Sequence, residues 1–225
     1  MKSHYRCFSF KKIGSFFGFI LALLVGYVLV SAANLEGSSS PVILALGDSL
    51  TAGFGVRENE SYPSLLQKML KEKGYPHRVI NAGVSGDTTA GGLRRIKWLL
   101  LHKPSIVILA LGANDGLRGL STGEMYSNLK KIIRICRDHG AEVLLVGMKV
   151  PPNFGEEYSR AFEKTFSLLA KKYHLRFLPF LLEGVASKRE YTQADGIHPL
   201  APGYKIVARS VWKYLEPMLM KSSRR

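Results

Sequence analysis

A serine stands where an apolar stretch of the chain ends. Residues 42–46 are all apolar, and Gly47-Asp48-Ser49-Leu50 follows them directly. This pattern is typical of a buried strand that presents a hydroxyl at the carboxyl edge of an α/β sheet, where such sheets bind ligands. A serine hydroxyl is a weak nucleophile unless a base accepts its proton and a third group orients that base. Ser49 is therefore a candidate nucleophile, although a serine at this place could also be the N-cap of a helix.

The carboxyl-terminal part of the chain supplies both missing groups. Asp195 and His198 stand three residues apart, directly before Pro199. His198 can take the proton from Ser49 and return it to the leaving group, while Asp195 accepts a hydrogen bond from the other ring nitrogen and fixes the tautomer. Together the three residues predict acyl transfer through a Ser-His-Asp triad and an acyl-enzyme.

Acyl transfer also needs hydrogen-bond donors for the oxyanion of its intermediate. Two further polar stretches follow predicted strands, at residues 83–87 (Gly-Val-Ser-Gly-Asp) and 112–115 (Gly-Ala-Asn-Asp). We expect the donors to be the backbone N–H groups of Ser49 and Gly83 and the side-chain amide of Asn114. Ser85 is a rival nucleophile, but its surroundings lack the last glycine of a Gly-x-Ser-x-Gly elbow.

The elements that must position these residues alternate along the chain. Apolar runs predict strands over residues 42–46, 78–81, 105–111, 142–148 and 175–180. Helical periodicity predicts helices between them, over residues 61–74, 89–102, 121–140, 158–173 and 202–215, caps and stops included. Alternation of strand and helix predicts one domain over residues 42–220, a three-layer α/β/α sandwich with a central parallel sheet. The carboxyl ends of parallel strands share one edge, so the candidate residues should converge there.

These four stretches, in this order, resemble the motifs of the GDSL-type or SGNH hydrolase superfamily. Within it they are similar to the group of periplasmic thioesterases that also act as lysophospholipases and arylesterases. The resemblance covers residues 42–219 and implies a flavodoxin-like fold, ester or thioester hydrolysis and no cofactor or metal. Residues 148–155 resemble the loop that covers the acyl group in that group, which implies that Pro151, Asn153 and Phe154 bind substrate. Acyl-chain preference depends on pocket shape, which the motifs do not give.

The amino-terminal segment has the pattern of an export signal. A basic start precedes a run without charge over residues 13–33, and residues 31–33 (Ser-Ala-Ala) could form a cleavage site. The run is also long enough to span a bilayer, so residues 1–33 are either a cleaved signal peptide or a membrane anchor. Both place the rest of the protein outside the cytoplasm, in the periplasm or tethered to the outer side of the cytoplasmic membrane. Residues 34–41 read as a linker and residues 221–225 as a basic tail.

The net charge of +15 has no module for nucleic acid beside it. We therefore expect a solvated surface, a small acyl ester or thioester as the partner, no nucleic acid, and a monomer that could touch a membrane surface. Three alternatives stay open. They are a carbohydrate (acyl-glycan) esterase of the same superfamily, a metal-dependent phosphoesterase using Asp48, Asp87, Asn114, Asp195 and His198, and a non-catalytic membrane-surface or carbohydrate-binding module.

The remaining polar residues have structural explanations. We expect Asp48 to organise its turn, Asp87 to be a cap or turn residue, and Asp115 to cap a helix. Cys136 falls on the apolar face of a predicted helix and reads as a small core residue. Four histidines near the ends of elements are expected in solvent, namely His77, His102, His139 and His174.

Overall fold

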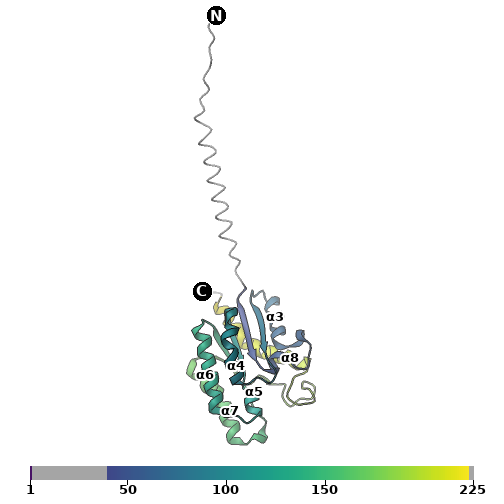
Figure 1. The fold of residues 1–225 in the computed structure, drawn as a ribbon. Coiled ribbons are helices and arrows are strands. Elements are labelled where there is room, and N and C mark those ends of the chain that lie inside the picture. Colours follow the sequence, from purple (N-terminus) through teal and green to yellow (C-terminus); the bar gives the residue numbers. More distant parts are fainter. Residues whose placement is uncertain (2–39, 223–225) are drawn as a thin grey trace. The chain divides into compact units, whose positions relative to one another are not determined.

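The computed structural model describes Met1 and residues 40–222. The expected signal or anchor segment, most of the linker and the end of the basic tail therefore lie outside the described residues. Five parallel strands form one sheet in the order β2-β1-β3-β4-β5 (Figure 1). The strands are β1 (Val42–Gly47), β2 (Arg78–Gly83), β3 (Pro104–Ala110), β4 (Glu142–Val146) and β5 (Arg176–Leu178). The parallel sheet confirms the predicted fold class.

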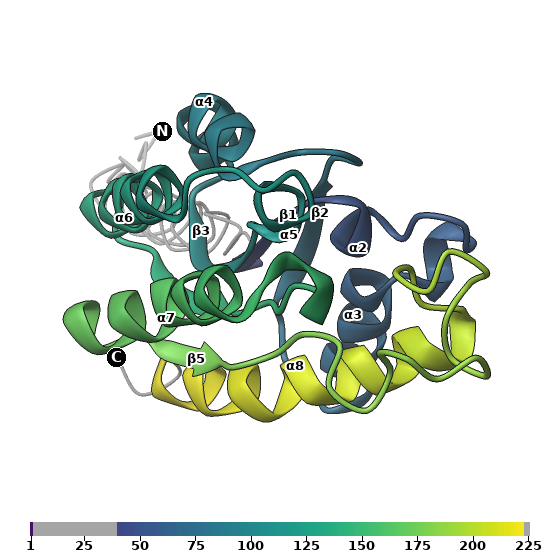
Figure 2. The same cartoon turned by 90° about the horizontal axis from the view of Figure 1, so that it is seen from below.

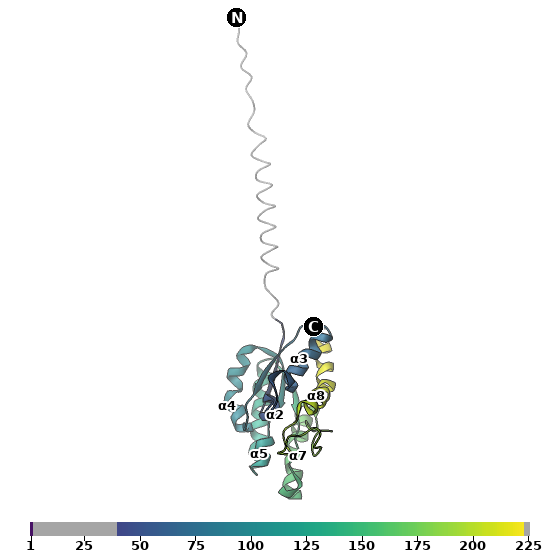
Figure 3. The ribbon, with the colours of Figure 1, turned by 90° about the vertical axis from the view of Figure 1, so that its right-hand side faces the viewer.

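Helices cover both faces of the sheet, as Figure 2 shows. The α-helices are α2 (Ser49–Ala52), α3 (Tyr62–Glu72), α4 (Thr89–Leu99), α5 (Ala113–Leu117), α6 (Thr122–Asp138), α7 (Glu156–Tyr173) and α8 (Ala201–Ser222). Short 3-10 helices are η2 (Glu58–Glu60), η3 (Leu100–His102) and η4 (Pro152–Phe154). Seen along the sheet, α4 lies on one side and α3 and α8 on the other (Figure 3). Within residues 40–222, no helix is both long and apolar enough to cross a membrane.

The central strands are apolar because they are buried on both faces. Every residue of β1 is buried, and so is every residue of β3 except Ser105. This is the usual composition of a parallel sheet between two helical layers. The outer strand β5 is shorter than predicted and ends at Leu178, because Pro179 follows and has no N–H to donate to a ladder.

The strand order reverses direction at β1. From β1 the chain first adds β2 on one side and then returns to add β3 on the other. Ligands bind at such a reversal, outside the carboxyl ends of the strands. We call this the carboxyl edge, and the opposite edge, at which the strands begin, the amino edge.

One expectation about local structure was wrong, and another is met in one of its two forms. His77 is buried, with 4% of its surface exposed, because Tyr75 packs between it and Trp212 on α8. Burial lowers the pKa of His77, and neither ring nitrogen has a hydrogen-bond partner in the part of the chain that the structure describes. The prediction that His77 is solvated was therefore wrong. Asp87 was expected to be a cap or turn residue, and the turn is confirmed, because its N–H donates to Val84 O at 3.0 Å. Its side chain does not cap α4; Thr88 does, through a bond from the N–H of Gly91.

Candidate active site

Ser49 is held at the carboxyl edge by a tight turn between β1 and α2. Asp48 is the N-cap of α2, and its Oδ1 accepts a hydrogen bond of 3.0 Å from the N–H of Leu50. Gly47 is required before it, because a Cβ there would lie 1.9 Å from Thr51 Oγ1. Ser49 is the first residue of α2, so its N–H is free of the helix ladder.

His198 and Asp195 lie beside Ser49. His198 Nε2 is 2.8 Å from Ser49 Oγ, and His198 Nδ1 is 2.6 Å from Asp195 Oδ2. The other carboxylate oxygen of Asp195 accepts the backbone N–H groups of Ile197 and His198, at 2.9 and 3.0 Å. A hydroxyl, an imidazole and a carboxylate are thus joined in one row, in the order that nucleophile, base and orienting group require.

The hydrogen bonds around Asp195 favour its ionised form. Partial burial opposes ionisation, but the hydrogen bonds from the His198 ring and from the two backbone N–H groups outweigh it and lower the pKa of Asp195 to about 2. Asp48 behaves in the opposite way. Its burial raises its pKa to about 6, although the Leu50 N–H and the nearby His198 favour its charged form.

Gln193 fixes the loop that carries His198, and sequence reasoning missed it. Its amide nitrogen donates to the carbonyl oxygens of Phe54 (2.8 Å) and Pro199 (3.1 Å), and its backbone N–H donates to His198 O (2.7 Å). The ring of Phe54 lies 4.7 Å from the His198 ring. Gln193 therefore ties the histidine loop to the segment after α2, so Ser49 and His198 keep their separation.

The expected oxyanion donors do not all lie free. The N–H of Gly83 donates to Asn81 Oδ1 at 3.0 Å, and a Cβ on Gly83 would lie 2.2 Å from Ala52 N. Close packing on α2 therefore already explains this glycine. Asn114 Nδ2 donates to Asp87 O at 3.0 Å, which brings the loop after β2 to the end of β3.

A second glycine of that loop is a further candidate donor. Gly86 has φ +78°, a conformation that favours glycine. Among the residues that the structure describes, neither the N–H of Gly86 nor that of Ser49 has a hydrogen-bond partner. The sequence contained a signal for Gly86, since this glycine lies in the same stretch as Gly83. In the structure it directly precedes Asp87, whose carbonyl accepts the hydrogen bond from Asn114.

Sequence reasoning did not single out Arg95, which connects the end of β1 with the end of β2. Its guanidinium donates to Gly47 O (2.9 Å), Ala82 O (2.7 Å) and Asp87 Oδ2 (2.8 Å). The carboxylate of Asp87 thus pairs with Arg95 in place of capping a helix. One side chain from α4 therefore holds the chain just before Ser49, just before Gly83 and at Asp87.

Asp115 does cap a helix, although not the one that contains it. It lies in α5, and its carboxylate accepts the backbone N–H of Thr89 (2.8 Å) and the Thr89 hydroxyl (2.6 Å) at the start of α4. The expectation for Asp115 is therefore confirmed, and the bond also ties the end of β3 to the loop after β2.

Of the expected substrate-binding residues, Asn153 and Phe154 lie on η4 and Pro151 directly before it. This segment follows β4 and so belongs to the carboxyl edge. Pro151 and Asn153 are exposed, and Phe154 is half-buried against Tyr158, with ring centroids 6.0 Å apart. No hydrogen bond or ring contact joins these three described residues to Ser49 or His198. Other connections at this edge add exposed apolar side chains, namely Phe54, Val84, Leu117, Leu120 and Leu200.

The acidic residues near the site do not form a metal-binding group. Within residues 40–222, no three His, Cys, Asp or Glu side chains come together in a way that could hold a metal ion. The donor set of the phosphoesterase alternative is divided instead. Asp48 binds a backbone N–H, Asp87 pairs with Arg95, and Asp195 pairs with His198.

Known proteins share this sequence and this arrangement. The profile of the GDSL-like Lipase/Acylhydrolase family matches residues 45–206. Esterase TesA of Pseudomonas aeruginosa is 39% identical over 199 residues, which cover 88% of this chain and 99% of that protein. An arylesterase of Vibrio mimicus is 42% identical over 78% of this chain and 88% of its own. Thioesterase 1/protease 1/lysophospholipase L1 of Escherichia coli K12 is 34% identical over 88% of this chain and 94% of its own.

Solved structures agree with the sequence comparison. The crystal structure of a TesA superposes with a TM-score of 0.76 and 41% identity, covering 78% of this chain and 98% of that one. The family profile lies within residues 45–206, and the chain from Ser40 onwards forms a compact unit of its own. The chain described here belongs to the GDSL-like lipase/acylhydrolase family.

Proposed function

We propose that this chain is a serine hydrolase of acyl esters and thioesters, with Ser49, His198 and Asp195 as its catalytic triad. The observation that carries the proposal is the row from Ser49 Oγ through the His198 ring to Asp195 Oδ2, with separations of 2.8 and 2.6 Å. The relatives named as an esterase, an arylesterase and a thioesterase support the same chemistry.

The reaction follows from the roles of these groups. Ser49 Oγ attacks the acyl carbonyl as His198 Nε2 takes its proton, and Asp195 stabilises the imidazolium. The N–H of Ser49 and the amide of Asn114 donate to the oxyanion, with the N–H of Gly83 or Gly86 as a third donor. Collapse of the intermediate passes the proton to the leaving alcohol or thiol and leaves an acyl-enzyme. Water then attacks, His198 again accepts a proton, and the acid departs from a regenerated Ser49.

The substrate class is a small molecule with an apolar acyl or aryl part. The exposed apolar side chains of the carboxyl edge and Pro151, Asn153 and Phe154 supply a surface for it. Simple acyl esters, aryl esters, acyl thioesters and lysophospholipids fit this description. The names of the relatives point to the same classes of substrate. The acyl-glycan alternative would need polar contacts to a sugar, whereas the exposed side chains Phe54, Val84, Leu117, Leu120 and Leu200 are apolar.

A panel of p-nitrophenyl esters of increasing chain length tests the proposal on residues 40–225. We expect turnover with a chain-length optimum that is lost in Ser49→Ala and unchanged by a chelator. Ser85→Ala is the matched control and should retain turnover. Activity that survives Ser49→Ala, or that a chelator abolishes, would overturn the serine mechanism.

The remaining expectations concern the whole chain. We propose that residues 1–33 direct export, as a signal peptide or an anchor, that residues 34–41 are a linker, and that residues 221–225 are a basic tail behind the hydrolase domain of residues 42–220. The protein would act as a monomer in the periplasm or on the outer side of the cytoplasmic membrane. Cell fractionation with an antibody against the domain checks this, and cytoplasmic recovery would contradict it.

A further inference from the structure

The charges of the domain are divided between the two edges of the sheet. The connections at the amino edge are residues 71–78, 97–103, 137–142 and 171–176, and they hold nine Lys and Arg against three carboxylates. The connections at the carboxyl edge are residues 48–60, 84–88, 112–121, 147–157 and 179–200, and they hold five Lys and Arg against ten carboxylates. The net positive charge is therefore concentrated away from Ser49.

The basic edge also carries exposed apolar side chains. Trp98 and Leu101, at the end of α4 and in η3, are 67% and 72% exposed. They stand between the exposed cations Lys97 and Lys103. An indole beside lysines is typical of a protein surface that sits at the boundary between lipid and water.

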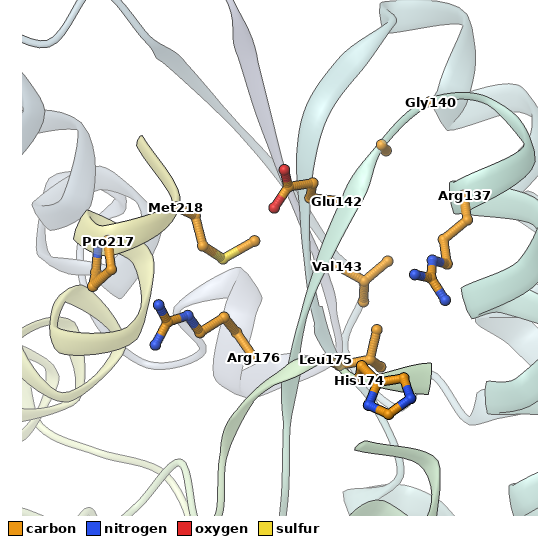
Figure 4. Close-up of a pocket in the computed structure, with 10 residues that line it drawn as sticks. Arg137, Gly140, Glu142, Val143, His174, Leu175, Arg176, Pro217 and Met218 are labelled. Atoms are coloured by element: carbon orange, nitrogen blue, oxygen red, sulfur yellow. The ribbon is translucent and has the colours of Figure 1, made fainter. Parts of the chain in front are cut away.

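The same edge contains a hollow of about 590 Å³ between the α6–β4 connection, the α7–β5 connection and the end of α8. Figure 4 shows Arg137 and His174 on one side of it and Arg176 with Met218 on the other. Glu142 also lines it. Arg137 donates to the carbonyl of Tyr173. The Arg176 guanidinium makes no hydrogen bond within the described part of the chain, so it is available to an anion such as a lipid phosphate.

The chain enters the domain at this edge. The carbonyl of Pro41, directly before β1, accepts a hydrogen bond from the N–H of Arg78 at the start of β2. The uncharged run of residues 13–33 is joined to β1 by only eight residues. The run therefore leads, along the chain, into the amino edge and not into the carboxyl edge.

We propose that the amino edge docks on the surface of an anionic phospholipid bilayer. Its lysines and arginines meet lipid phosphates, and Trp98 and Leu101 enter the headgroup region. The carboxylates of the carboxyl edge are repelled, so Ser49 faces the aqueous phase. The docked enzyme then takes substrates from solution, in contrast to an enzyme whose active site faces the bilayer. This proposal does not rest on the esterase assignment, because binding is measured without turnover.

Vesicle binding by residues 40–225 tests the proposal without any contribution from the apolar run. The vesicles are phosphatidylcholine alone or an equal mixture with phosphatidylglycerol. We expect binding to the mixture only, lost at about 0.5 M salt, where the screening length is below 5 Å. Lys172→Gln/Arg176→Gln should weaken it about 25-fold, since each cation near an anionic surface contributes about fivefold. The matched control at the other edge, Lys188→Gln/Arg189→Gln, should change it less than twofold.

Fluorescence of Trp98 reports which edge touches lipid. The other tryptophan, Trp212, is buried, so a blue shift on vesicles and quenching by lipids brominated on their chains should arise from Trp98 and vanish in Trp98→Phe. Equal weakening by the two double variants, absence of Trp98 quenching from bound protein, or no preference for anionic vesicles would each overturn the proposal. A folded domain, checked by circular dichroism, is required of every variant.

Discussion

Arg95→Met should destabilise the domain and damage the active site together. The guanidinium makes three hydrogen bonds, to Gly47 O, Ala82 O and Asp87 Oδ2, and the Arg95 and Asp87 side chains are only 21% and 10% exposed. Hydrogen bonds to charged groups contribute about 1.5–3 kcal/mol each, and a buried ion pair broken on one side costs about 3–5 kcal/mol. Because water can partly replace the guanidinium, we expect a loss of about 3 kcal/mol in unfolding free energy.

The effect on turnover follows from what Arg95 holds. Gly47 precedes the Asp48-Ser49 turn, and Asp87 carries the carbonyl that Asn114 binds. A displacement of about 1 Å can cost a factor of about 100 in rate, so kcat should fall about 10- to 100-fold under conditions in which the variant is folded.

Urea unfolding and p-nitrophenyl ester hydrolysis measure both effects. Arg94→Met is the matched control, because Arg94 is the exposed neighbour on the same helix and should change stability by less than about 0.5 kcal/mol. A cycle with Asp87→Asn should show a coupling of about 1–3 kcal/mol. If Arg95→Met left both stability and kcat within the range of the control, the role given to Arg95 would be refuted.

Three further predictions concern single groups. Asp195→Asn should lower kcat about 10³- to 10⁴-fold, because it loses the carboxylate that orients His198. The thermal midpoint at pH 7 should fall slightly, because the folded state favours the ionised carboxylate; a loss of kcat below tenfold would count against the triad. Asp48 keeps its proton to higher pH in the folded state than in the unfolded state, so between about pH 4 and pH 6 the domain should lose stability as the pH rises, by up to about 3 kcal/mol. Urea titrations of wild type and Asp48→Asn across this range check it, and an equal slope in both would exclude Asp48 as the cause. The Cys136 thiol, buried with its pKa raised to about 12, should react with a disulfide reagent in residues 40–225 only after denaturation, and rapid native labelling would show that the core opens.

Much of the fold could be predicted because buried parallel strands are recognisable without partners. Residues 42–46 and 105–111 are apolar on both faces, and their alternation with helical patterns leaves few other architectures. The end of β5 was misjudged although Pro179, which has no N–H to donate to a ladder, directly follows Leu178 in the sequence. His77 was misjudged because its burial depends on Tyr75 and on Trp212, which is 135 residues away along the chain.

The residues of the site also fall into two groups, those that the sequence could single out and those that it could not. Ser49, Asp195 and His198 could be singled out because few residue types act as nucleophile, base and orienting group. Gln193 and Arg95 could not, because their contribution is a set of hydrogen bonds to carbonyls that only the folded chain brings within reach. The choice between Gly83 and Gly86 as oxyanion donor depends on the direction of a backbone N–H, which residue type does not give.

Covalent labelling tests the central claim most directly. Diethyl p-nitrophenyl phosphate should react with residues 40–225 as Ser49 Oγ attacks phosphorus and expels p-nitrophenolate, leaving a diethylphosphoryl group on the serine. We predict one adduct, on the peptide that contains Ser49, with loss of activity in proportion to labelling and at least 100-fold slower reaction in His198→Ala. An adduct on Ser85, or inactivation while Ser49 stays unmodified, would contradict the assignment of Ser49 as the nucleophile.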